Sequence, residues 1–548
     1  MSVSAADLKA EGNILFTQKN FREAETKYTA AIEASDETAD SKGLAILYAN
    51  RAACRLSLKR HMDACADAAK AAKLDPTYAK AHARMAVAQD CLGNYSLSVQ
   101  NWKCALGALP TSNLTLAEQQ QKAQYKEGLE VATARLAKLQ NIVIGDANTS
   151  GDGGPFIMKN KGCFPWDIAA EVVARLRVQS PVDPSSSAWV VHFAYEEFMK
   201  GVRRLGQIKI DQATGTMAGM HGGIVDLSNG VLRDVRVMHI PESEFFTKYN
   251  NQVMLEMKGY NGWRDAGPDM VIREALARQR TKGWAAVRPA LSITIRSWIM
   301  QAVMNSGMRQ LHNVAVEFYK NSLHVIRTLR ESWILESKDD RGAIFQKTFI
   351  FGIQNRYIEA LMMSYVDSDA SESAGRLEEL LKESELLIRE IDEELRQPRS
   401  QDPVDPGFIS SFYVYPRGHA YAMKGFYYNK ISVRSGNDCK TFLRKAALEY
   451  ITAAKCFPED DETHPWYLYI ALGNMLNARS FPLRETLDVM KRIRISALKA
   501  KEIWRHSSLS AGGVWDKFKE TAKQEEELRC MVLQGRFTMN SCVGGEPV

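Results

Sequence analysis

The sequence lacks any long apolar segment that is free of charged residues. Its best candidate, residues 289–304, is interrupted by Arg296 and is too short to cross a bilayer. The first twelve residues, MSVSAADLKAEG, contain no apolar stretch that could serve as a secretory signal. We therefore expect a protein of the cytoplasm, or of cytoplasm and nucleus, without a membrane partner.

A cysteine framework is also missing. The chain has nine cysteines at irregular spacing, with no Cys-x-x-Cys pair and no spacing typical of a zinc site. Four of them fall in the first 110 residues, where they have the character of small core residues. An odd number without a framework fits a reducing compartment, and we expect neither disulfides nor a bound metal.

A strong excess of one charge is absent as well. The 71 Lys and Arg residues nearly balance the 65 Asp and Glu residues, which leaves a net charge of +6 over 548 residues. Basic residues are interspersed with acidic ones, whereas a dedicated nucleic-acid binder shows a basic stripe or domain. A chain of this length, 45% apolar and 25% charged, is expected to fold into two to four globular units.

What the sequence does contain is an internal repeat near its start. Ala64 and Ser98 lie 34 residues apart, as do Pro76 and Pro110, whereas the first repeat is six residues longer in the loop at 36–42. The corresponding positions of the three repeats are Ala24, Tyr28 and Ala31, then Ala64, Ala68 and Ala71, then Ser98, Trp102 and Ala105; small residues also recur at Gly12, Ala52 and Ala86.

This period is typical of the tetratricopeptide repeat (TPR), in which each unit is a pair of antiparallel helices. Small residues let the two helices approach closely, and stacking of neighbouring units supplies the hydrophobic core that one pair cannot form alone. The sequence predicts a three-unit solenoid over 1–112. The segment 113–140 is rich in Ala, Gln, Lys and Glu, so it is predicted to be a helix that caps the last repeat.

Three short stretches carry a resemblance to a known family. They are LKAEGN at 8–13, LYANRA at 47–52 and YAKAHAR at 78–84. With these, the first 140 residues resemble the TPR domains of co-chaperones that bind the C-terminal tails of the seventy- and ninety-kilodalton heat-shock proteins. The resemblance implies a carboxylate clamp formed by five side chains, which are Lys9, Asn13, Asn50, Lys80 and Arg84.

The chemistry of these residue types agrees with that role. Lys9 and Asn13 are four residues apart, as are Lys80 and Arg84, so each pair lies on one face of a helix. Lys and Arg form charge-assisted hydrogen bonds to carboxylates, and Asn can both donate and accept. An acidic peptide end would then bind with roughly micromolar affinity. A generic repeat surface is the alternative, because Asn and Lys are common at these positions.

The chain changes character after the repeats. A Gly-rich segment at 145–154 indicates a flexible linker over 141–163. The following region, 164–289, is predicted to be a small α+β module, with a helix at 188–205 and strands at 208–210 and 223–227. The pair Asn229-Gly230, between two β-prone stretches, predicts a hairpin.

This module invites two chemical hypotheses, and neither is well supported by its residues. The Gly-rich run at 214–223 lacks the Gly-Lys-Ser/Thr ending of a phosphate loop. His192 and Glu196 share a helix face and could bind a metal with His221 or His239, although such a pair is more often a surface contact. No cofactor is expected. An enzyme with its active site in 164–289 is kept as an alternative.

The remainder, 290–537, is predicted to be a helical array. Its segment 377–395 shows one apolar stripe. Ala446, Tyr450, Ala453 and Pro458 repeat the spacing of Ala64, Ala68, Ala71 and Pro76, which indicates a degenerate TPR-like unit without the clamp residues. The last residues, 538–548, are predicted to form a loose tail.

The sequence thus predicts a mainly α protein with an N-terminal TPR solenoid and cap helix, a small central α+β module and a C-terminal TPR-like array. Its predicted function is that of a co-chaperone or adaptor, without catalysis, that captures the acidic C-terminal peptide of a cytosolic heat-shock chaperone and holds other protein partners. A TPR scaffold for another complex is the first alternative, and the enzyme is the second.

Overall fold

The computed structural model describes residues 4–35, 40–144, 163–179, 181, 183–211, 213–367, 370–397 and 404–542. Over these residues the protein is mainly α-helical, which confirms the predicted fold class. Most of the predicted linker, 141–163, lies outside the described residues. The chain divides into two compact units, of which the first comprises Met1–Pro155 with Glu256–Arg341 and the second Phe156–Leu255 with Gly342–Val548.

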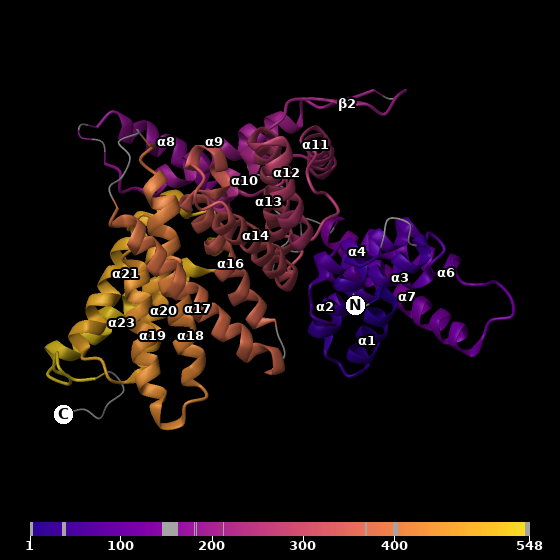
Figure 1. Ribbon diagram of the computed structural model, residues 1–548. Helices are drawn as coiled ribbons and strands as arrows, with labels where there is room; N and C mark the ends of the chain where they lie inside the picture. Colours follow the sequence, from indigo (N-terminus) through magenta and orange to yellow (C-terminus); the bar gives the residue numbers. More distant parts are fainter. Residues whose placement is uncertain are drawn as a thin grey trace. The chain divides into compact units, whose positions relative to one another are not determined.

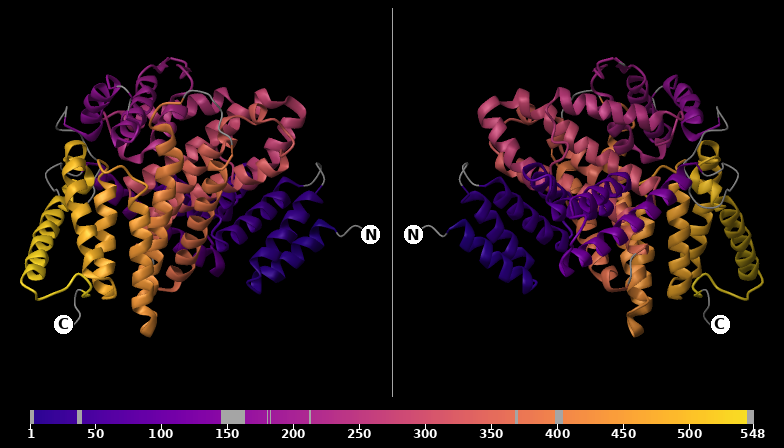
Figure 2. Two further views of the ribbon diagram at one scale, coloured as in Figure 1. Left: turned by 90° about the vertical axis from the view of Figure 1, so that its left-hand side faces the viewer. Right: turned by 90° about the vertical axis from the view of Figure 1, so that its right-hand side faces the viewer.

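The first unit begins with three antiparallel helix pairs and a long seventh helix (Figures 1 and 2). It continues, after the insertion of part of the second unit, with three further helices and a short one. These helices are α1 (Ala5–Thr17), α2 (Phe21–Glu33), α3 (Ser41–Ser57), α4 (His61–Leu74), α5 (Ala79–Cys91), α6 (Tyr95–Gly107), α7 (Leu116–Ile144), α12 (Pro268–Lys282), α13 (Trp284–Gly307), α14 (His312–Ser332) and α15 (Lys338–Arg341).

The small residues of the repeat allow neighbouring helices to pack closely, as the pattern predicts. Gly12 in α1 lies against the ring of Tyr28 in α2, and a Cβ atom built on Gly12 would come within 2.9 Å of that ring. The same relation joins α7 to the last repeat, because a Cβ atom on Gly128 would lie 2.5 Å from the indole of Trp102. The long helix α7 therefore packs closely on α6 and covers the apolar end of the repeats.

In its described residues, the second unit is also mainly helical, with one hairpin and an isolated β-bridge between Pro482 and Cys542. Its elements are α8 (Pro165–Arg177), α9 (Ser187–Leu205), β1 (Lys209–Ile210), β2 (Met217–Ala218), α10 (Gly223–Arg233), η1 (Val235–Val237), η2 (Ala343–Phe345), α16 (Lys347–Val366), α17 (Ala370–Leu395), η3 (Ser410–Val414), α18 (Tyr415–Ser432), η4 (Gly436–Asp438), α19 (Cys439–Ala454), α20 (Thr463–Ala478), α21 (Leu483–Trp504), α22 (Ser508–Ala511) and α23 (Val514–Leu533). Helix α11 (Phe245–Gly259) spans the boundary between the units.

The predicted strand at 223–227 and the hairpin at Asn229-Gly230 are wrong, because both fall within helix α10. Ile224, Leu227 and Val231 are fully buried at the spacing of a helix face. Gly230 serves close packing instead of a turn, since a Cβ atom there would lie 2.8 Å from the carbonyl oxygen of Ala194 in α9. Burial of one helix face therefore outweighs the local turn preference.

Two other elements predicted in 164–289 are present in the structure. The helix predicted at 188–205 is α9, and the strand predicted at 208–210 is β1. Strand β1 pairs antiparallel with β2, with Lys209 opposite Ala218 and Ile210 opposite Met217. The β content of the described part of this region is thus one hairpin with two residues in each strand.

The boundary predicted at 289/290 falls inside helix α13, and the adjoining helices α12 to α14 belong with the repeats in the first unit. They do so because α12 and α14 make polar contacts with α4. This division of the chain differs from the predicted succession of modules. Sequence periodicity cannot show it, since it depends on contacts between segments about 200 residues apart.

The TPR-like spacing at 446–458 corresponds to a true helix pair, α18 and α19. A Cβ atom on Gly425 of α18 would lie 2.7 Å from the ring of Tyr450 in α19, which repeats the relation of Gly12 to Tyr28. In α17, the apolar stripe is buried at Leu377, Leu380, Leu387 and Ile391. Part of the predicted loose tail is held in place, because Ser541 O accepts a hydrogen bond from Leu483 N at 2.8 Å.

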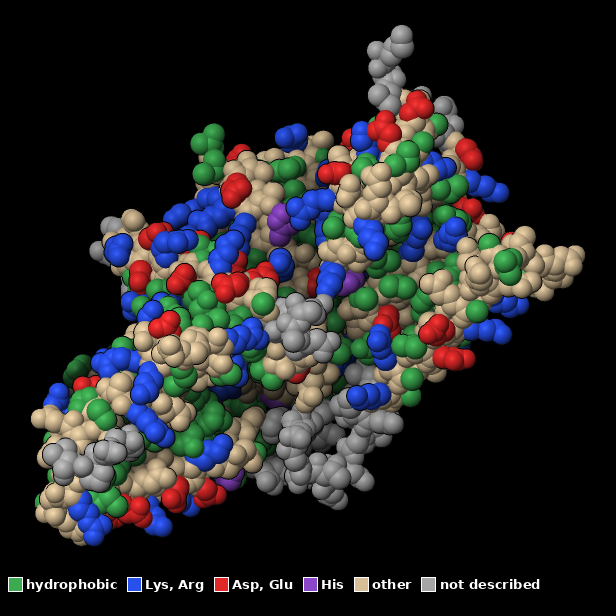
Figure 3. Space-filling view, turned by 90° about the horizontal axis from the view of Figure 1, so that it is seen from below, with side chains coloured by type: hydrophobic (Ala, Val, Ile, Leu, Met, Phe, Trp, Pro, Cys, Tyr) green, Lys and Arg blue, Asp and Glu red, His purple; other side chains and the backbone are tan. Residues whose placement is uncertain are grey.

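The surface agrees with the balanced composition. On the face drawn in Figure 3, Lys and Arg side chains are interspersed with Asp and Glu and do not form a single block. None of the helices in the described ranges is long and apolar enough to span a bilayer.

Candidate peptide-binding groove

The five predicted site residues all lie on the first helix of a pair. Lys9 and Asn13 are in α1, Asn50 is in α3, and Lys80 and Arg84 are in α5. Asn13 and Lys80 are exposed, whereas the other three are partly buried. These helices succeed one another at the same position in the three repeats.

Three of the five side chains form a continuous line of hydrogen bonds. The Arg84 guanidinium donates to Asn50 Oδ1 at 3.3 Å, and the Asn50 amide donates to Asn13 Oδ1 at 3.4 Å. Asn13 Oδ1 also accepts a shorter bond of 2.7 Å from the hydroxyl of Tyr28. The line runs across all three repeats, so the structure brings Asn13, Asn50 and Arg84 together.

The three cations of the set have no carboxylate partner within the described parts of the chain. Arg84 bonds only to a neutral amide, and Lys9 and Lys80 make no hydrogen bond or ion pair with any described residue. The two lysines lie one helical turn before Asn13 and Arg84, respectively, on the same helix faces. Three positive charges are therefore available to a ligand along α1 and α5.

Burial and neighbouring groups shape the electrostatics at Arg84. Burial lowers the pKa of this guanidinium from its usual value, opposed by the nearby hydroxyls of Tyr78, Tyr125 and Tyr28. Burial likewise raises the pKa of Tyr28 to about 12, so this hydroxyl remains a donor to Asn13. A partly desolvated cation gains more from an anionic ligand than an exposed one does, because water screens it less.

Two arginines of α3 offer a contrast. Arg51 binds Asp67 through two hydrogen bonds of 2.8 Å, and Arg55 binds Glu25 at 2.8 Å. These two are buried and compensated by carboxylates of the same unit. Arg84, by comparison, is partly buried and has no acidic partner among the described residues.

Sequence reasoning missed the tyrosines that surround Arg84. Tyr28 was identified only as a packing residue of the repeat, and Tyr78 and Tyr125 were not singled out. Tyr78 directly precedes α5, at its N-cap position, and Tyr125 lies in the cap helix α7. Tyr78 is the first residue of the YAKAHAR stretch, which is a usable signal, whereas the role of Tyr125 becomes visible only once α7 is placed.

The residues considered for a metal site have other contacts. His192 lies 3.5 Å from Glu196 as a helical pair, and the ring of His239 stacks on Trp166 while its Nδ1 faces the Val237 carbonyl oxygen. Among the described residues there is no group of three or more His, Cys, Asp or Glu side chains arranged to hold a metal ion. The Gly-rich run 214–223 includes β2 and ends at the start of α10.

An open depression of about 530 Å³ lies beside α9, where Glu197 and Lys200 are among the lining residues. Glu197 accepts a hydrogen bond from Arg233 at 3.1 Å, and Lys200 lies 3.3 Å from Asp226. Both partners belong to α10. These polar groups therefore take part in the packing of α9 against α10.

No protein-family model matches the chain. Its N-terminal repeats nevertheless form a TPR domain. In sequence the chain is similar to the heat shock protein STI1 of Saccharomyces cerevisiae, with 38% identity over 118 residues, which are 22% of this chain and 19% of STI1. It is also 35% identical over 102 residues to the small glutamine-rich tetratricopeptide repeat-containing protein 2 of the same yeast, covering 19% of this chain and 28% of the relative.

A further relative is the SGT1 homolog of Oryza sativa, with 39% identity over 87 residues, 16% of this chain and 22% of the relative. The chain thus spans less than a third of the length of these relatives. Among solved structures, it is similar to the Sgt2 TPR domain from Aspergillus fumigatus, with 23% identity, a TM-score of 0.22, and coverage of 29% of this chain and 91% of that one. Yeast Tom70 matches with 12% identity, a TM-score of 0.24, and coverage of 95% and 96%. Because both TM-scores are low, the fold is taken from the helix pairs described above.

Proposed function

We propose that the TPR domain captures the acidic C-terminal peptide of a heat-shock chaperone, and that the protein is a cytoplasmic adaptor. Lys9, Asn13, Asn50, Lys80 and Arg84 would hold the terminal carboxylate and an acidic side chain of the peptide. The observation that supports this most is the set of three cations that lack carboxylate partners among the described residues, beside a line of amides.

The amide line fits the same ligand. Asn13 and Asn50 can each accept from a peptide N–H and donate to a peptide carbonyl or carboxylate oxygen. Arg84 can bind a carboxylate through two parallel hydrogen bonds, which ammonium groups cannot do. Capture of a chain end in this way is one of the recurring modes of peptide recognition.

The relatives point to the same class of partner. STI1 is named a heat shock protein, and its similarity to this chain covers a segment about as long as the three repeats. The rest of the molecule would then act on other protein partners, with the peptide contact raising their local concentration. Nucleic acid and membranes play no part in this proposal.

The test is calorimetric titration of the full chain with a short peptide ending in Glu-Glu-Val-Asp. We expect micromolar binding by the wild type and at least a tenfold loss in the Lys80→Ala/Arg84→Ala double variant. The matched control is Lys70→Ala/Lys103→Ala, which removes two exposed charges from the second helices α4 and α6. Equal affinities of the wild type and the groove variant would show the proposal to be wrong.

A further inference from the structure

Helices α4 and α12 begin without a capping side chain of their own. The N-cap residues, Arg60 for α4 and Gly267 for α12, make no side-chain cap. The first N–H groups of a helix need acceptors and favour negative charge. Other groups can therefore supply acceptors to these two helix starts.

The two regions supply each other's caps. Glu317 of α14 accepts a hydrogen bond from the Met62 N–H at the start of α4, at 3.0 Å, and also pairs with the ring of His61. In return, Asp63 of α4 accepts from the Asp269 N–H at the start of α12, at 3.3 Å. Each helix start is thus capped by a carboxylate about 200 to 250 residues away in the chain.

The backbones approach closely at this point. A Cβ atom on Gly267 would lie 2.2 Å from Asp63 Oδ1 and 2.6 Å from Asp63 Cα, so any side chain at this position would collide with α4. The N-terminus of α12 therefore packs directly on α4, and a residue larger than glycine at 267 would prevent this contact.

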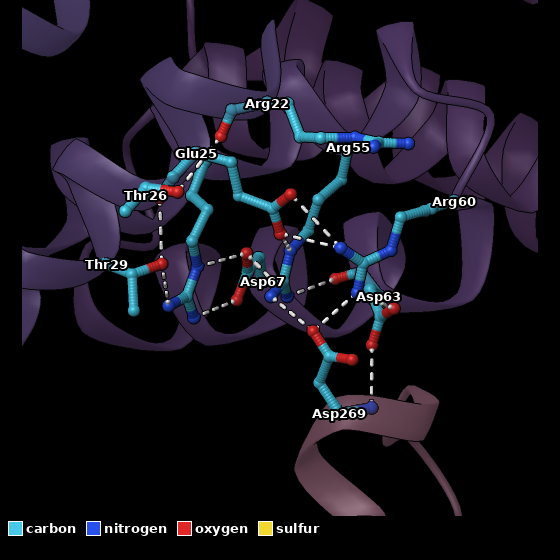
Figure 4. Close-up of polar contacts among 10 residues, drawn as sticks. Arg22, Glu25, Thr26, Thr29, Arg55, Arg60, Asp63, Asp67 and Asp269 are labelled. Atoms are coloured by element: carbon cyan, nitrogen blue, oxygen red, sulfur yellow. Dashed lines mark hydrogen bonds and ion pairs between the residues drawn. The ribbon is translucent and has the colours of Figure 1, made fainter. Parts of the chain in front are cut away.

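A partly buried network of charges joins this contact to the repeats (Figure 4). Arg60 donates to Asp63 at 2.7 Å and to Glu25 at 3.0 Å, and it also binds Asp269. Arg55 binds Glu25 at 2.8 Å and Asp269 at 3.1 Å. Asp269 thus bridges two arginines that are held at their other side by α2.

On helices α2 and α3, the network reaches residues that directly follow residues of the proposed binding site. Arg51, which follows Asn50 in α3, donates to Thr29 at 3.2 Å, and Thr29 follows Tyr28 in α2. Asn50 and Tyr28 meet at Asn13 on the groove side. Helices α2 and α3 are therefore joined on both faces, once by the proposed site and once by the charge network.

We infer that α12 and α14 are part of the peptide-binding domain. Asp269 is a positioning residue that holds α2 and α3 from behind the groove through Arg55 and Arg60, and Glu317 is one that holds the start of α4. This inference rests on the proposed function, since it concerns the affinity of the same site. Neither residue would touch the peptide. The effect of Asp269 would pass through Arg55 and Arg60 to the helices that carry Asn50 and Tyr28, and that of Glu317 through the start of α4.

The network is sensitive to protonation. Burial and the neighbouring Asp269 raise the pKa of Asp63 to about 6. The other charged groups that face it are Arg55 and Arg60. These arginines also bind Glu25 and Asp67, and His324 faces Asp269. As pH falls through 6, Asp63 gains a proton, and the cap of α12 and the contact with Arg60 lose their charge. The carboxylates of the peptide, with ordinary pKa values near 4, remain ionised there.

The experiment uses the full chain and the same peptide. Asp269→Asn removes one charge of the network while keeping the shape of the side chain, and we expect about 2- to 30-fold weaker binding. Asp269→Glu restores the charge and should recover much of the affinity. Asp265→Asn is the matched control, because it makes the same change at an exposed position four residues earlier.

Two readouts separate positioning from general stability. Peptide should slow hydrogen exchange of the α12 amides in the wild type, because coupling between two sites is reciprocal, and this protection should be lost in Asp269→Asn. Wild-type affinity should also fall between pH 7 and about 5.5, and Asp63→Asn should remove that dependence.

The outcomes distinguish the two proposals. If the wild type binds the peptide but Asp269→Asn binds equally well and α12 gains no protection, the positioning role is refuted while the groove assignment stands. If the wild type does not bind the peptide at all, both are refuted. Circular dichroism of each variant checks that a loss of affinity is not a loss of folding.

Discussion

At the scale of single residues, the arginines of the TPR domain serve two different purposes. Arg51 and Arg55 are buried against carboxylates and hold helices together. Arg84 is partly buried beside tyrosines and an amide, without an acidic partner in the described parts of the chain. Leaving a buried charge uncompensated is costly, so such an arrangement is expected where an anionic ligand completes it.

The role of Arg84 can be tested by single substitutions. Arg84→Ala removes a charge-assisted contact of about 1.5–3 kcal/mol, so peptide affinity should fall roughly 10- to 150-fold. Arg84→Lys keeps the charge but loses the planar guanidinium, so its peptide affinity should lie between those of the alanine variant and the wild type. Calorimetry measures both, and Lys103→Ala in α6 should leave the affinity unchanged.

Tyr28 provides a milder test, because its hydroxyl contacts Asn13 and its ring packs on Gly12. Tyr28→Phe keeps the ring and removes only the 2.7 Å hydrogen bond. Such a bond contributes about 0.5–1.5 kcal/mol, so we expect a 2- to 12-fold loss of peptide affinity with little change in thermal stability. A fall in melting temperature without a change in affinity would contradict this role.

How far the sequence could go at this scale depends on the range of the contacts. The five predicted clamp positions come from the resemblance to a known family, whose motifs each lie within a single helix. A spacing of four agrees with it, since it places Lys9 with Asn13 and Lys80 with Arg84 on one face. The hydrogen bond from Tyr28 to Asn13 joins the two helices of one repeat. The TPR pattern predicts that these helices pack together, but it does not predict this bond. The contact of Asp63 with Asp269 joins segments 206 residues apart, for which one sequence carries no signal.

At the scale of helices, glycines mark where two helices touch. In unit two, Gly425 of α18 lies under the ring of Tyr450, whereas Gly473 of α20 has open space around its Cβ position. Gly425→Ala should therefore destabilise the protein by about 1–3 kcal/mol through overpacking. Gly473→Ala should stabilise it by up to about 1 kcal/mol, because alanine favours a helix interior. Denaturant unfolding measures the free energy of unfolding of both variants. Equal changes in this free energy would contradict the packing described.

The same scale explains one failure and one success of prediction. Helix α9 is long and strongly amphipathic, so its pattern was clear in the sequence. Helix α10 is only eleven residues long and contains Asn229-Gly230, which favours a turn in isolation. Here Gly230 allows α10 to lie against the backbone of α9. Tertiary packing of this kind cannot be read from local propensity.

At the scale of the whole molecule, each compact unit is built from two separate chain segments. In the second unit, a buried cluster of charges joins those segments. Arg236 binds Asp461 through two hydrogen bonds of 2.9 Å and lies 3.7 Å from Glu462. Such contacts depend on both segments being present, so we expect this unit to unfold as one cooperative transition.

Glu462 gives this cluster a pH dependence. Burial raises its pKa to about 7, above the value near 4.5 of an exposed glutamate. Ionisation of Glu462 therefore destabilises the folded state. The stabilisation that the protonated side chain provides is fully present below pH 4.5 and is lost as pH rises to about 7. Glu462→Gln should flatten this slope and raise the free energy of unfolding at pH 8 by on the order of 1–3 kcal/mol. Urea unfolding across this pH range measures it, and a steeper slope in the variant would contradict the assignment.

The central claim is that unpaired cations of the TPR groove bind the free carboxylate at the end of an acidic peptide. The most direct measurement compares two forms of one peptide ending in Glu-Glu-Val-Asp, one with a free C-terminus and one amidated, titrated into the full chain at low and high salt. We predict clear binding of the free acid that weakens with salt, and at least tenfold weaker binding of the amide. Equal affinities for the two forms, or an affinity indifferent to salt, would contradict the account.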